Sequence, residues 1–390
     1  MNIHEYQAKQ ILARYGVTIP KGHVAESAEK AEIAATKIGG SRWVVKAQIH
    51  AGDRGKTGGI RPAESLENIR EHASDLIGMK LVTPQTGPAG RKVNQVYVEQ
   101  ACDIDRELYL AMLVDRDSAQ VAIIASTVGG MEIERVAESS PNKIIKTLIN
   151  HTDGLGSEHS RQVAQALGLT GQHENTVVQL LASLYHTFVE LDASLIEINP
   201  LVVTGSNELL PLDVKMSFDD NALFRHPELE KLRDDTEEDP DRLERARHGF
   251  NYIKLGGHIG CVVTGAGLAL ATIDLIKRHG GEPANFLDLP PTATRSQVAE
   301  AFKLILKDDD VRAIFVNAVG GGFTRCNVIA EGIITASQDV GINVPLIIRL
   351  AGTAREAAMM LLRNSRLEFI STDDLADAAT RAVDAAGGRR

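Results

Sequence analysis

The carboxy-terminal part of the chain alternates between short apolar runs and helical stretches, and this alternation constrains the fold more than any other feature. Strands are expected at 259–263, 284–289, 311–317, 344–350 and 367–370. A helix is expected after each strand. The first ends near residue 279, the next three begin near 295, 326 and 353, and the last ends near 386. Five such repeats predict a parallel, doubly wound sheet, in which ligands bind beyond the carboxyl ends of the strands.

Three loops follow strands at those carboxyl ends. The loop at 264–267 has part of a dinucleotide fingerprint, but its third glycine is absent, which favours a tight turn. A second loop covers 289–292, and a third, at 317–325, leads into a helix start, where free amides and the helix dipole favour an anion. A purely structural turn is the alternative, although three glycines in a row are costly for that alone. The candidate substrate residues are Thr264, Gly320, Gly321, Gly322, Phe323 and Thr324.

Length and composition predict a soluble protein with more than one domain. The chain has 390 residues, of which 43% are hydrophobic and 24% charged, and no apolar run approaches the roughly 20 residues of a membrane span. A formal net charge of -10 argues against nucleic acid as a partner. The three cysteines have neither disulfide nor zinc spacing, which fits a reducing cytoplasm. The charged stretch 227–247 predicts a boundary between domains at 1–240 and 250–390.

The amino-terminal half contains basic and acidic side chains in an arrangement that suits a nucleotide. A strand led by 43–45 carries Lys46, and a glycine-rich loop follows at 50–59. This loop imitates a P-loop, but the first required glycine is His50, so we reject that interpretation and expect a loop able to close over a triphosphate. Strand-like runs at 93–99, 107–114 and 120–126 predict a second sheet, in which Glu99 and Glu107 lie at strand ends.

A hairpin is predicted where two apolar runs, 195–203 and 209–216, flank the turn formers 205–208. If the turn centres on residue 206, Asn199 faces Asp213, close enough for an amide oxygen and a carboxylate to share one hard cation. Glu197 opposes Lys215 on the same face. From these residues alone, a magnesium–nucleotide platform and an ordinary hairpin with a polar face are equally good interpretations.

Long ordered segments resemble the β subunit of succinate–CoA ligase along essentially the whole chain. They include NIHEYQAKQIL, WVVKAQIHAGDRGKTGG, VNQVYVEQACDIDRELYL, LIEINPLVV and NALFR. The resemblance implies a two-lobed ATP-grasp domain of mixed α+β structure, followed by a flavodoxin-like α/β domain that acts as a CoA ligase. It implies ATP, Mg²⁺ and CoA as the small molecules used, with Mg²⁺ held by Asn199 and Asp213. By the same resemblance, the nucleotide-binding residues are Lys46, Asp53, Arg54, Gly55, Glu99, Cys102 and Glu107.

The chain departs from this family mainly in the loops at the acid-binding end. Thr264 stands where the family usually has asparagine, and 290–292 reads Pro-Pro-Thr in place of three glycines. The family's glycine loop is one residue shorter than 317–325, and Ala351 replaces a glutamate. Asp53 replaces a glycine, which is a milder change. We infer that the ATP machinery is kept and the acid pocket altered, to suit malate, citrate or a sulfonate.

The resemblance also implies a partner, because the phosphorylated histidine of this family belongs to a separate α subunit. The complex would be αβ or α2β2, acting on a small carboxylic acid with ATP or GTP, and no membrane or nucleic acid is implied. None of the chain's own histidines lies in a matching loop, so none is nominated. The rival interpretations are a self-sufficient ATP-grasp ligase and a catalytically silent nucleotide-binding subunit.

Overall fold

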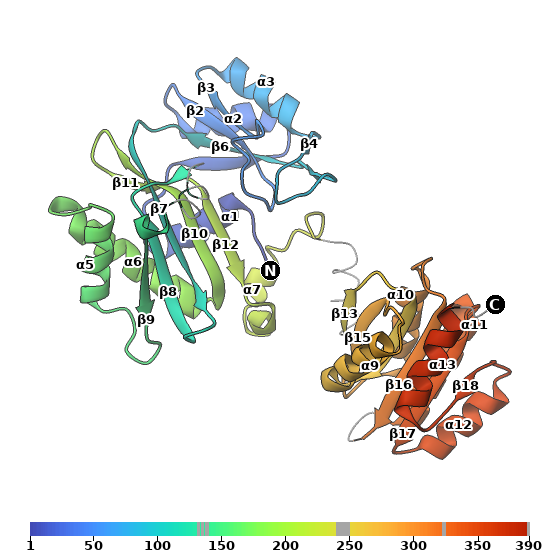
Figure 1. Ribbon diagram of the computed structural model, residues 1–390. Coiled ribbons are helices and arrows are strands. Elements are labelled where there is room, and N and C mark those ends of the chain that lie inside the picture. The colour runs from blue at the N-terminus through green and yellow to red at the C-terminus, as the bar shows by residue number, and fades with distance from the viewer. Residues whose placement is uncertain (131–132, 134–135, 137–139, 239–249, 322–324, 388–390) are drawn as a thin grey trace. The chain divides into compact units, whose positions relative to one another are not determined.

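The computed structural model describes residues 1–130, 133, 136, 140–238, 250–321 and 325–387. The chain forms two compact units, residues 1–237 and 238–390, which are considered separately below (Figure 1). None of the helices in the described part is both long and apolar enough to cross a membrane.

The first unit has a small lobe built on a four-stranded antiparallel sheet. Across the sheet the strands are β1 (Gly22–Ala25), β6 (Val96–Gln100), β2 (Trp43–Ala47) and β3 (Ile60–Ala63). Helices α2 (Ala28–Ile38) and α3 (Leu66–Leu76) pack on one face, against Val45 and Val98 among others. Because side chains alternate along a strand, Lys46 and Glu99 point to the opposite face, away from these helices. A short hairpin, β4 (Lys80–Leu81) with β5 (Arg91–Lys92), completes the lobe.

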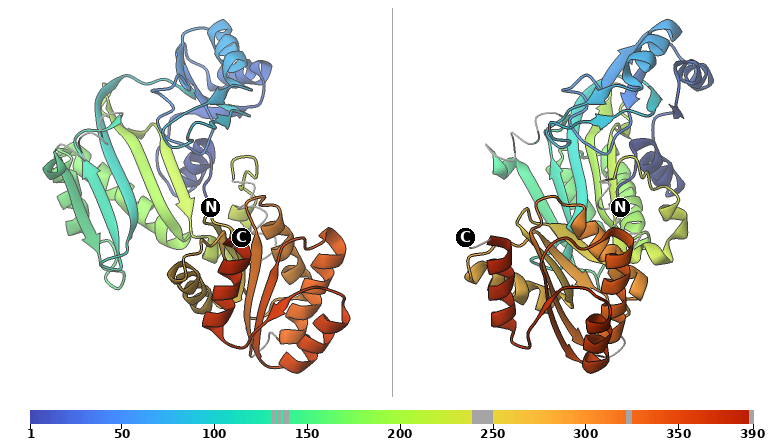
Figure 2. Two further views of the ribbon diagram at one scale, coloured as in Figure 1. Left: turned by 45° about the vertical axis from the view of Figure 1, so that its right-hand side comes forward. Right: turned by 90° about the vertical axis from the view of Figure 1, so that its right-hand side faces the viewer.

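The large lobe contains a six-stranded sheet in the order β11-β10-β7-β8-β9, with β12 also paired to β10 (Figure 2). Its strands are β7 (Ile104–Asp115), β8 (Gln120–Ser126), β9 (Ile144–Ile149), β10 (Ala193–Thr204), β11 (Leu209–Pro211) and β12 (Val214–Phe218). The helices packed in its core are α1 (Glu5–Arg14), α5 (Ser157–Ala166) and α6 (Gln172–Glu190). The lobe also contains the short helices η2 (Pro141–Lys143), η3 (Asp220–Arg225) and α7 (Pro227–Glu230).

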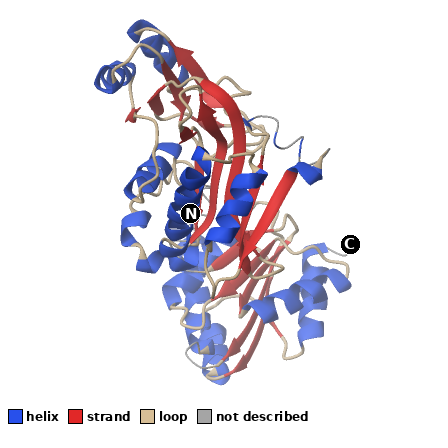
Figure 3. Ribbon diagram, turned by 90° about the vertical axis from the view of Figure 1, so that its left-hand side faces the viewer, coloured by secondary structure: helices blue, strands red, loops and turns tan. Residues whose placement is uncertain are grey.

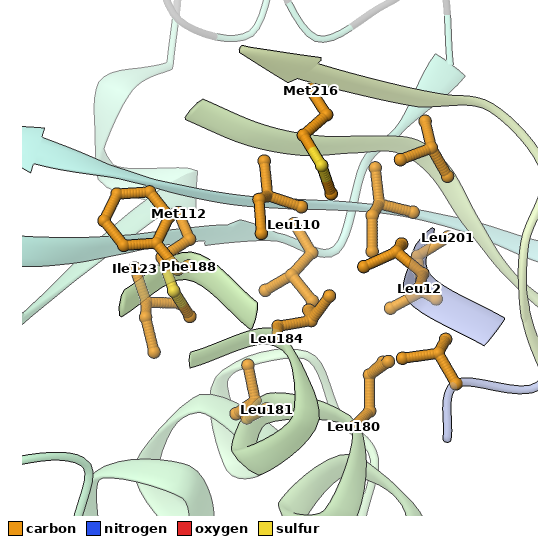
Figure 4. Packing of buried hydrophobic residues seen from close by; sticks show 14 of the residues in the cluster. Leu12, Leu110, Met112, Ile123, Leu180, Leu181, Leu184, Phe188, Leu201 and Met216 are labelled. Carbon is orange, nitrogen blue, oxygen red and sulfur yellow. The ribbon is translucent and has the colours of Figure 1, made fainter. Parts of the chain in front are cut away.

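Figure 4 shows how this core joins helices to strands. Leu184 and Phe188 of α6 and Leu12 of α1 pack against Leu110 and Met112 of β7. Full burial of a side chain of this size stabilises the fold by about 1.5–3 kcal/mol relative to leaving it exposed. The amino-terminal helix is therefore fixed to the sheet that carries the predicted hairpin.

The predicted register of the hairpin is confirmed. Glu197 pairs with Lys215 between β10 and β12, and the amide of Asn199 donates to the carbonyl oxygen of Asp213 over 3.1 Å. The loop at 205–208 joins β10 to β11 in the same register, because Val203 pairs with Leu209.

The expectation that the three runs at 93–99, 107–114 and 120–126 share one sheet is wrong. Strand β6, which carries Glu99, pairs with β1 and β2 in the small lobe, whereas β7 and β8 belong to the large lobe. Strand β6 stays in the small lobe because Val96 and Val98 are buried in that lobe's core. The chain passes to the large lobe after Gln100, where β6 ends. Glu99 consequently lies beside Lys46, and Glu107 lies inside β7 in the other lobe.

The second unit contains a six-stranded sheet in the order β13-β15-β14-β16-β17-β18. Its strands are β13 (Asn251–Lys254), β14 (Ile259–Thr264), β15 (Asn285–Leu289), β16 (Ala313–Gly320), β17 (Leu346–Gly352) and β18 (Ile370–Ser371). The five strands from β14 to β18 are parallel. Numbered along the chain from β14, they lie across the sheet in the order 2-1-3-4-5, which is the flavodoxin-like order and confirms the predicted class. The antiparallel edge strand β13 was not predicted.

Helices cover both faces of this sheet (Figure 3). The helices α10 (Arg295–Leu306), α11 (Cys326–Val340) and α12 (Arg355–Asn364) share one core cluster. The other face is covered by α9 (Ala266–Arg278) and α13 (Leu375–Gly387). The sheet is thus doubly wound, and the loops after β14, β15, β16 and β17 lie at its carboxyl edge.

Candidate functional site

A cavity of about 320 Å³ in the first unit is lined by residues from both lobes. The small lobe contributes the glycine-rich loop, and the large lobe contributes the hairpin and part of its sheet. The polar and charged side chains that line it are Asn2, Glu5, His50, Asp53, Arg54, Lys56, Gln85, Tyr109, Glu197, Asn199, Asp213 and Lys215.

The two predicted metal ligands lie side by side in this cavity and are held by neighbours. The Oδ1 atom of Asn199 accepts from the amide of Gly130 over 2.6 Å, and its Nδ2 atom donates to the carbonyl oxygen of Gly130 over 3.2 Å. The two carboxylate oxygens of Asp213 accept from Nη2 of Arg54 over 2.7 and 2.8 Å. Each side chain is therefore oriented before any ligand binds.

Behind the cavity, the ammonium groups of two lysines contact the same three residues. Lys9 and Lys46 each lie 3.0 Å from Oε1 of Glu5 and donate over 2.6 Å to the carbonyl oxygen of Leu212. Each also donates to one oxygen of Glu99. An ammonium has three protons to donate, and Lys46 uses all three, whereas Lys9 donates two hydrogen bonds and forms an ion pair with Glu5. Lys9 has no exposed surface and Lys46 is 5% exposed.

Arg54 joins these buried charges to the hairpin. Its Nη2 atom donates to Oε2 of Glu5 over 2.8 Å as well as to Asp213, and its Nη1 atom donates to the carbonyl oxygen of Ala47 over 2.7 Å. The six charged residues form a network of three cations and three carboxylates. They are Lys9, Lys46, Arg54, Glu5, Glu99 and Asp213.

Mutual attraction outweighs burial in this network. Burial opposes ionisation of Glu5, but the charges of Lys46, Lys9 and Arg54 hold the pKa of its carboxyl well below the usual range. Burial likewise acts to lower the pKa of Lys46, and the carboxylates of Glu5 and Glu99 raise it above its ordinary value. Glu5 and Lys46 are therefore both ionised at neutral pH.

The remaining predicted nucleotide residues are not all at the cavity wall. Asp53 lines the cavity in a left-handed conformation, with φ 59°, and its carboxylate pairs with Lys56 over 2.8 Å. The described residues that line the cavity do not include Gly55, Cys102 or Glu107. The partial burial of Cys102 raises the pKa of its thiol.

Three side chains at or behind the site were missed by sequence reasoning. Glu5 and Lys9 lie one helical turn apart on α1, a spacing that signals an ion pair but not its burial. Tyr109 lines the cavity from β7, and burial together with the nearby carboxylate of Glu197 raises the pKa of its phenol. No sequence signal distinguishes this tyrosine from an ordinary strand residue.

The donor set at the hairpin fits Mg²⁺. Among the described residues no group of three or more His, Cys, Asp or Glu side chains could hold a metal ion. Mg²⁺ is usually bound by one or two carboxylates together with substrate phosphates and water, rather than by a complete protein cage. One carboxylate and one amide oxygen facing a nucleotide-sized cavity meet that requirement.

In the second unit, hydrogen bonds join the loops at the carboxyl edge of the sheet. The hydroxyl of Thr264 accepts from the amide of Val319 over 2.9 Å, and the amide of Thr353 donates to the carbonyl oxygen of Gly320 over 2.9 Å. A β-carbon at Gly320 would lie 2.7 Å from the carbonyl oxygen of Thr353, so only glycine allows this approach. Gly321 follows directly, whereas the candidate residues Gly322, Phe323 and Thr324 lie outside the described part of the chain.

A buried polar chain supports the same edge from below. The guanidinium of Arg349 donates over 2.9 Å to Oδ1 of Asn317, whose Nδ2 atom donates over 2.8 Å to the hydroxyl of Thr272. Asn317 and Thr272 have no exposed surface. Because each buried polar atom has a partner, this chain fixes β16 and β17 against α9.

Comparison with known proteins identifies both units. The family model described as ATP-grasp domain matches residues 2–203, and that described as CoA-ligase matches residues 262–383. Succinate–CoA ligase [ADP-forming] subunit beta of Paramagnetospirillum magneticum is 54% identical over 394 residues, covering 99% of this chain and 99% of that protein. The protein of the same name from Nitratiruptor sp. is 51% identical over 389 residues, covering all of both chains.

A solved structure agrees in fold. ATP citrate lyase from Methanothrix soehngenii, in complex with citrate and coenzyme A, matches with a TM-score of 0.73 and 16% identity over 98% of this chain and 99% of that one. The ATP-grasp and CoA-ligase architecture expected from the sequence is thereby confirmed. The chain belongs to the family of β subunits of ADP-forming succinate–CoA ligases, which are acid–thiol ligases.

Proposed function

We propose that this chain is the β subunit of an ADP-forming ligase that joins a small di- or tricarboxylate to CoA, using ATP and Mg²⁺. The observation that carries the proposal is the identity of 54% to a β subunit of this class along the full length of both chains. The cavity between the two lobes, with its basic loop and its paired amide and carboxylate, supports the same conclusion.

In the proposed nucleotide site, Asn199 and Asp213 hold Mg²⁺, which supplies neutralisation of phosphate charge when bound. Arg54 lines the cavity and has a fixed orientation, so it is placed to contact phosphate oxygens. Lys46 and Glu99 act from behind the wall, because both are committed to the buried network. Asp53, Gly55, Cys102 and Glu107 complete the proposed nucleotide-binding set.

The proposed reaction transfers the γ-phosphoryl group of ATP to a ring nitrogen of a histidine on a partner α subunit, which releases ADP. An oxygen of the acid's carboxylate then attacks that phosphorus, the P–N bond breaks, and an acyl phosphate forms as the histidine leaves. The thiolate of CoA attacks the acyl carbon, and inorganic phosphate leaves. The loop at Gly320 and Gly321 precedes the amino terminus of α11, where backbone amides favour an anion.

The acid is proposed to be more polar than succinate, with malate as the first alternative. Thr264 stands where the family usually has asparagine, and its hydroxyl is tied to Val319 of the neighbouring strand. A threonine held in this way presents a shorter polar group than asparagine would, which leaves room for a substituent on the acid.

The decisive experiment combines this chain with its α subunit, ATP, Mg²⁺ and CoA, and measures thioester formation with succinate, malate, citrate and sulfoacetate. We expect one of the hydroxylated or sulfonated acids to exceed succinate, and Thr264→Asn to shift the ratio of kcat/KM values towards succinate by about 10-fold or more. Full activity of this chain without the α subunit would refute the two-subunit mechanism. Inactivity of the complex on every acid would favour a silent nucleotide-binding subunit.

A further inference from the structure

Helix α1 carries two residues next to the proposed magnesium site that have no assigned role, Glu5 and Lys9. Lys9 has no exposed surface and is not among the described residues lining the cavity, so its ammonium does not reach a bound nucleotide. Besides the ring of Tyr97, its ammonium contacts Glu5, Glu99 and the carbonyl oxygen of Leu212, and its effect on that site passes through these three groups.

The first connection runs through the backbone of the hairpin. Leu212 directly precedes Asp213, and its carbonyl oxygen accepts from both Lys9 and Lys46 over 2.6 Å. The next carbonyl along the strand, that of Asp213, accepts from the amide of Asn199 over 3.1 Å. The peptide group that sets the direction of the Asp213 side chain is therefore held by two charged donors.

The second connection runs through side chains. Oε2 of Glu5 and the carboxylate of Asp213 accept from the same nitrogen, Nη2 of Arg54, over 2.8 Å and 2.7 Å. Glu5 thus fixes the guanidinium that orients Asp213. Helix α1 itself is anchored in the core of the large lobe through Ala8, Ile11 and Leu12.

Glu5 and Lys9 add one negative and one positive charge, so together they do not change the net charge of the site. Their contribution is one of orientation, not of attraction for phosphate. We infer that Glu5 and Lys9 of helix α1 are positioning residues that hold Asp213, and through it the hairpin, in the geometry that binds Mg²⁺ with the nucleotide. This inference rests on the proposed function of the hairpin and extends it to the amino-terminal helix.

The test is the double variant Glu5→Gln/Lys9→Met in the full-length chain. It removes one charge of each sign and keeps the side chains close to their original size, so the remaining network stays neutral. Calorimetric titration with ADP at a series of Mg²⁺ concentrations gives the Mg²⁺ concentration at half-saturation. We expect that midpoint to rise by about 10- to 100-fold, as for other residues that orient metal ligands.

The matched control is Glu26→Gln/Lys30→Met, because Glu26 and Lys30 form an ion pair at the same four-residue spacing on the surface, 2.6 Å apart. The control should keep the wild-type midpoint. A merely structural effect of the buried variant would lower the fraction of protein that binds and leave the midpoint in place. That outcome, or an unchanged midpoint in fully binding protein, overturns the inference.

A second measurement uses the wild-type protein and does not depend on the variant folding. ADP with Mg²⁺ should slow hydrogen exchange of the amides of α1 relative to ADP alone, while α2 of the small lobe should show no such difference. Equal exchange along α1 in the two conditions overturns the inference. If the wild-type chain shows no Mg²⁺-dependent binding of ADP, the proposed function fails and this inference fails with it.

Discussion

Replacing Asp213 by asparagine tests both of its contacts, the one with Arg54 and the one proposed with Mg²⁺. In the structure the carboxylate accepts from Nη2 of Arg54 over 2.7 and 2.8 Å, within a network of three cations and three carboxylates. Asp213→Asn leaves three cations facing two carboxylates, although the amide oxygen still accepts one hydrogen bond. The change in shape is minimal, so the consequences are electrostatic.

Without ligand, the loss of unfolding free energy caused by Asp213→Asn depends on how exposed Arg54 and Asp213 are. A hydrogen bond between charged groups contributes about 1.5–3 kcal/mol. The side chain of Arg54 is 5% exposed, but that of Asp213 is 31% exposed, so water screens part of the interaction. We therefore expect Asp213→Asn to lower the free energy of unfolding of the first unit by about 1–2 kcal/mol.

With Mg²⁺–ADP bound, Asp213→Asn should lower the free energy of unfolding by a larger amount. At about 100 times its Kd, Mg²⁺–ADP should stabilise the wild-type protein by about 2.7 kcal/mol. A loss of about 10- to 100-fold in affinity reduces that stabilisation to about 1.4–0.4 kcal/mol, so the difference between wild type and variant should widen by about 1.3–2.3 kcal/mol. A widening between ADP alone and ADP with Mg²⁺ is specific to a metal ligand, since a residue that acts only through Arg54 would change the difference equally in these two conditions.

Trp43 gives an assay confined to the relevant unit. It is the only tryptophan in the chain, it is 6% exposed, and its indole N–H donates to the carbonyl oxygen of Gly39 over 3.0 Å. Its fluorescence during urea unfolding therefore reports the small lobe, which contains Arg54. The unfolding free energies of wild type and variant are compared without ligand, with ADP, and with ADP and Mg²⁺.

Asp75→Asn provides the control, because Asp75 forms an arginine pair of similar length on the surface of the same lobe. Its Oδ2 atom lies 2.8 Å from Nη1 of Arg61, with side-chain exposures of 56% and 28%. We expect a cost below about 1 kcal/mol that is the same in all three conditions. A difference for Asp213→Asn that does not widen on adding Mg²⁺ would refute the assignment of Asp213 as a metal ligand.

Two further predictions concern pH and packing. Burial, with His4 nearby, lowers the pKa of His50 to about 3, so protonation favours the unfolded chain, in which histidine titrates near pH 6.5. Stability should therefore fall as the pH drops below about 6.5, by about 2 kcal/mol at pH 5, and His50→Asn should remove that loss in urea unfolding followed by Trp43 fluorescence. In the second unit, a β-carbon at Gly332 would lie 2.4 Å from Cβ of Val298, so Gly332→Ala should cost about 1–3 kcal/mol. Gly267→Ala, where nothing lies within 4 Å, should cost nothing, and calorimetry of the full chain compares the two.

Features set by local periodicity could be predicted from the sequence. The two-residue period of a strand and the cluster of turn formers at 205–208 were enough to pair Asn199 with Asp213 and Glu197 with Lys215. The alternation of strands and helices likewise gave the parallel sheet of the second unit. In both cases the partner of each residue lies within the same or the next element, so its position follows from the pattern.

Contacts between distant elements could not be predicted in this way. Lys9 and Glu99 are 90 residues apart in the sequence, and nothing in either segment shows that the two side chains meet. A lysine on a short helix and an acid at a strand end are usually solvated, which is why neither suggested a buried pair. The prediction placed β6 in the wrong sheet for the same reason, because periodicity gives the faces of a strand but not its neighbouring strands.

Lys46 shows how the buried network changes the chemistry inferred from a single residue. Its place in a strand suggested a cation directed at phosphate, yet its ammonium already donates to Glu5, Glu99 and the carbonyl oxygen of Leu212. With no proton left to donate, it contributes to the site by holding the hairpin against the small lobe. The cations that line the cavity are instead Lys56, Lys215 and Arg54, and the guanidinium of Arg54 is shared between Glu5 and Asp213. Because a carboxylate has lone pairs for several partners, Asp213 can accept from Arg54 and also ligate the proposed Mg²⁺, so the contact with Arg54 orients the ligand without excluding the metal ion.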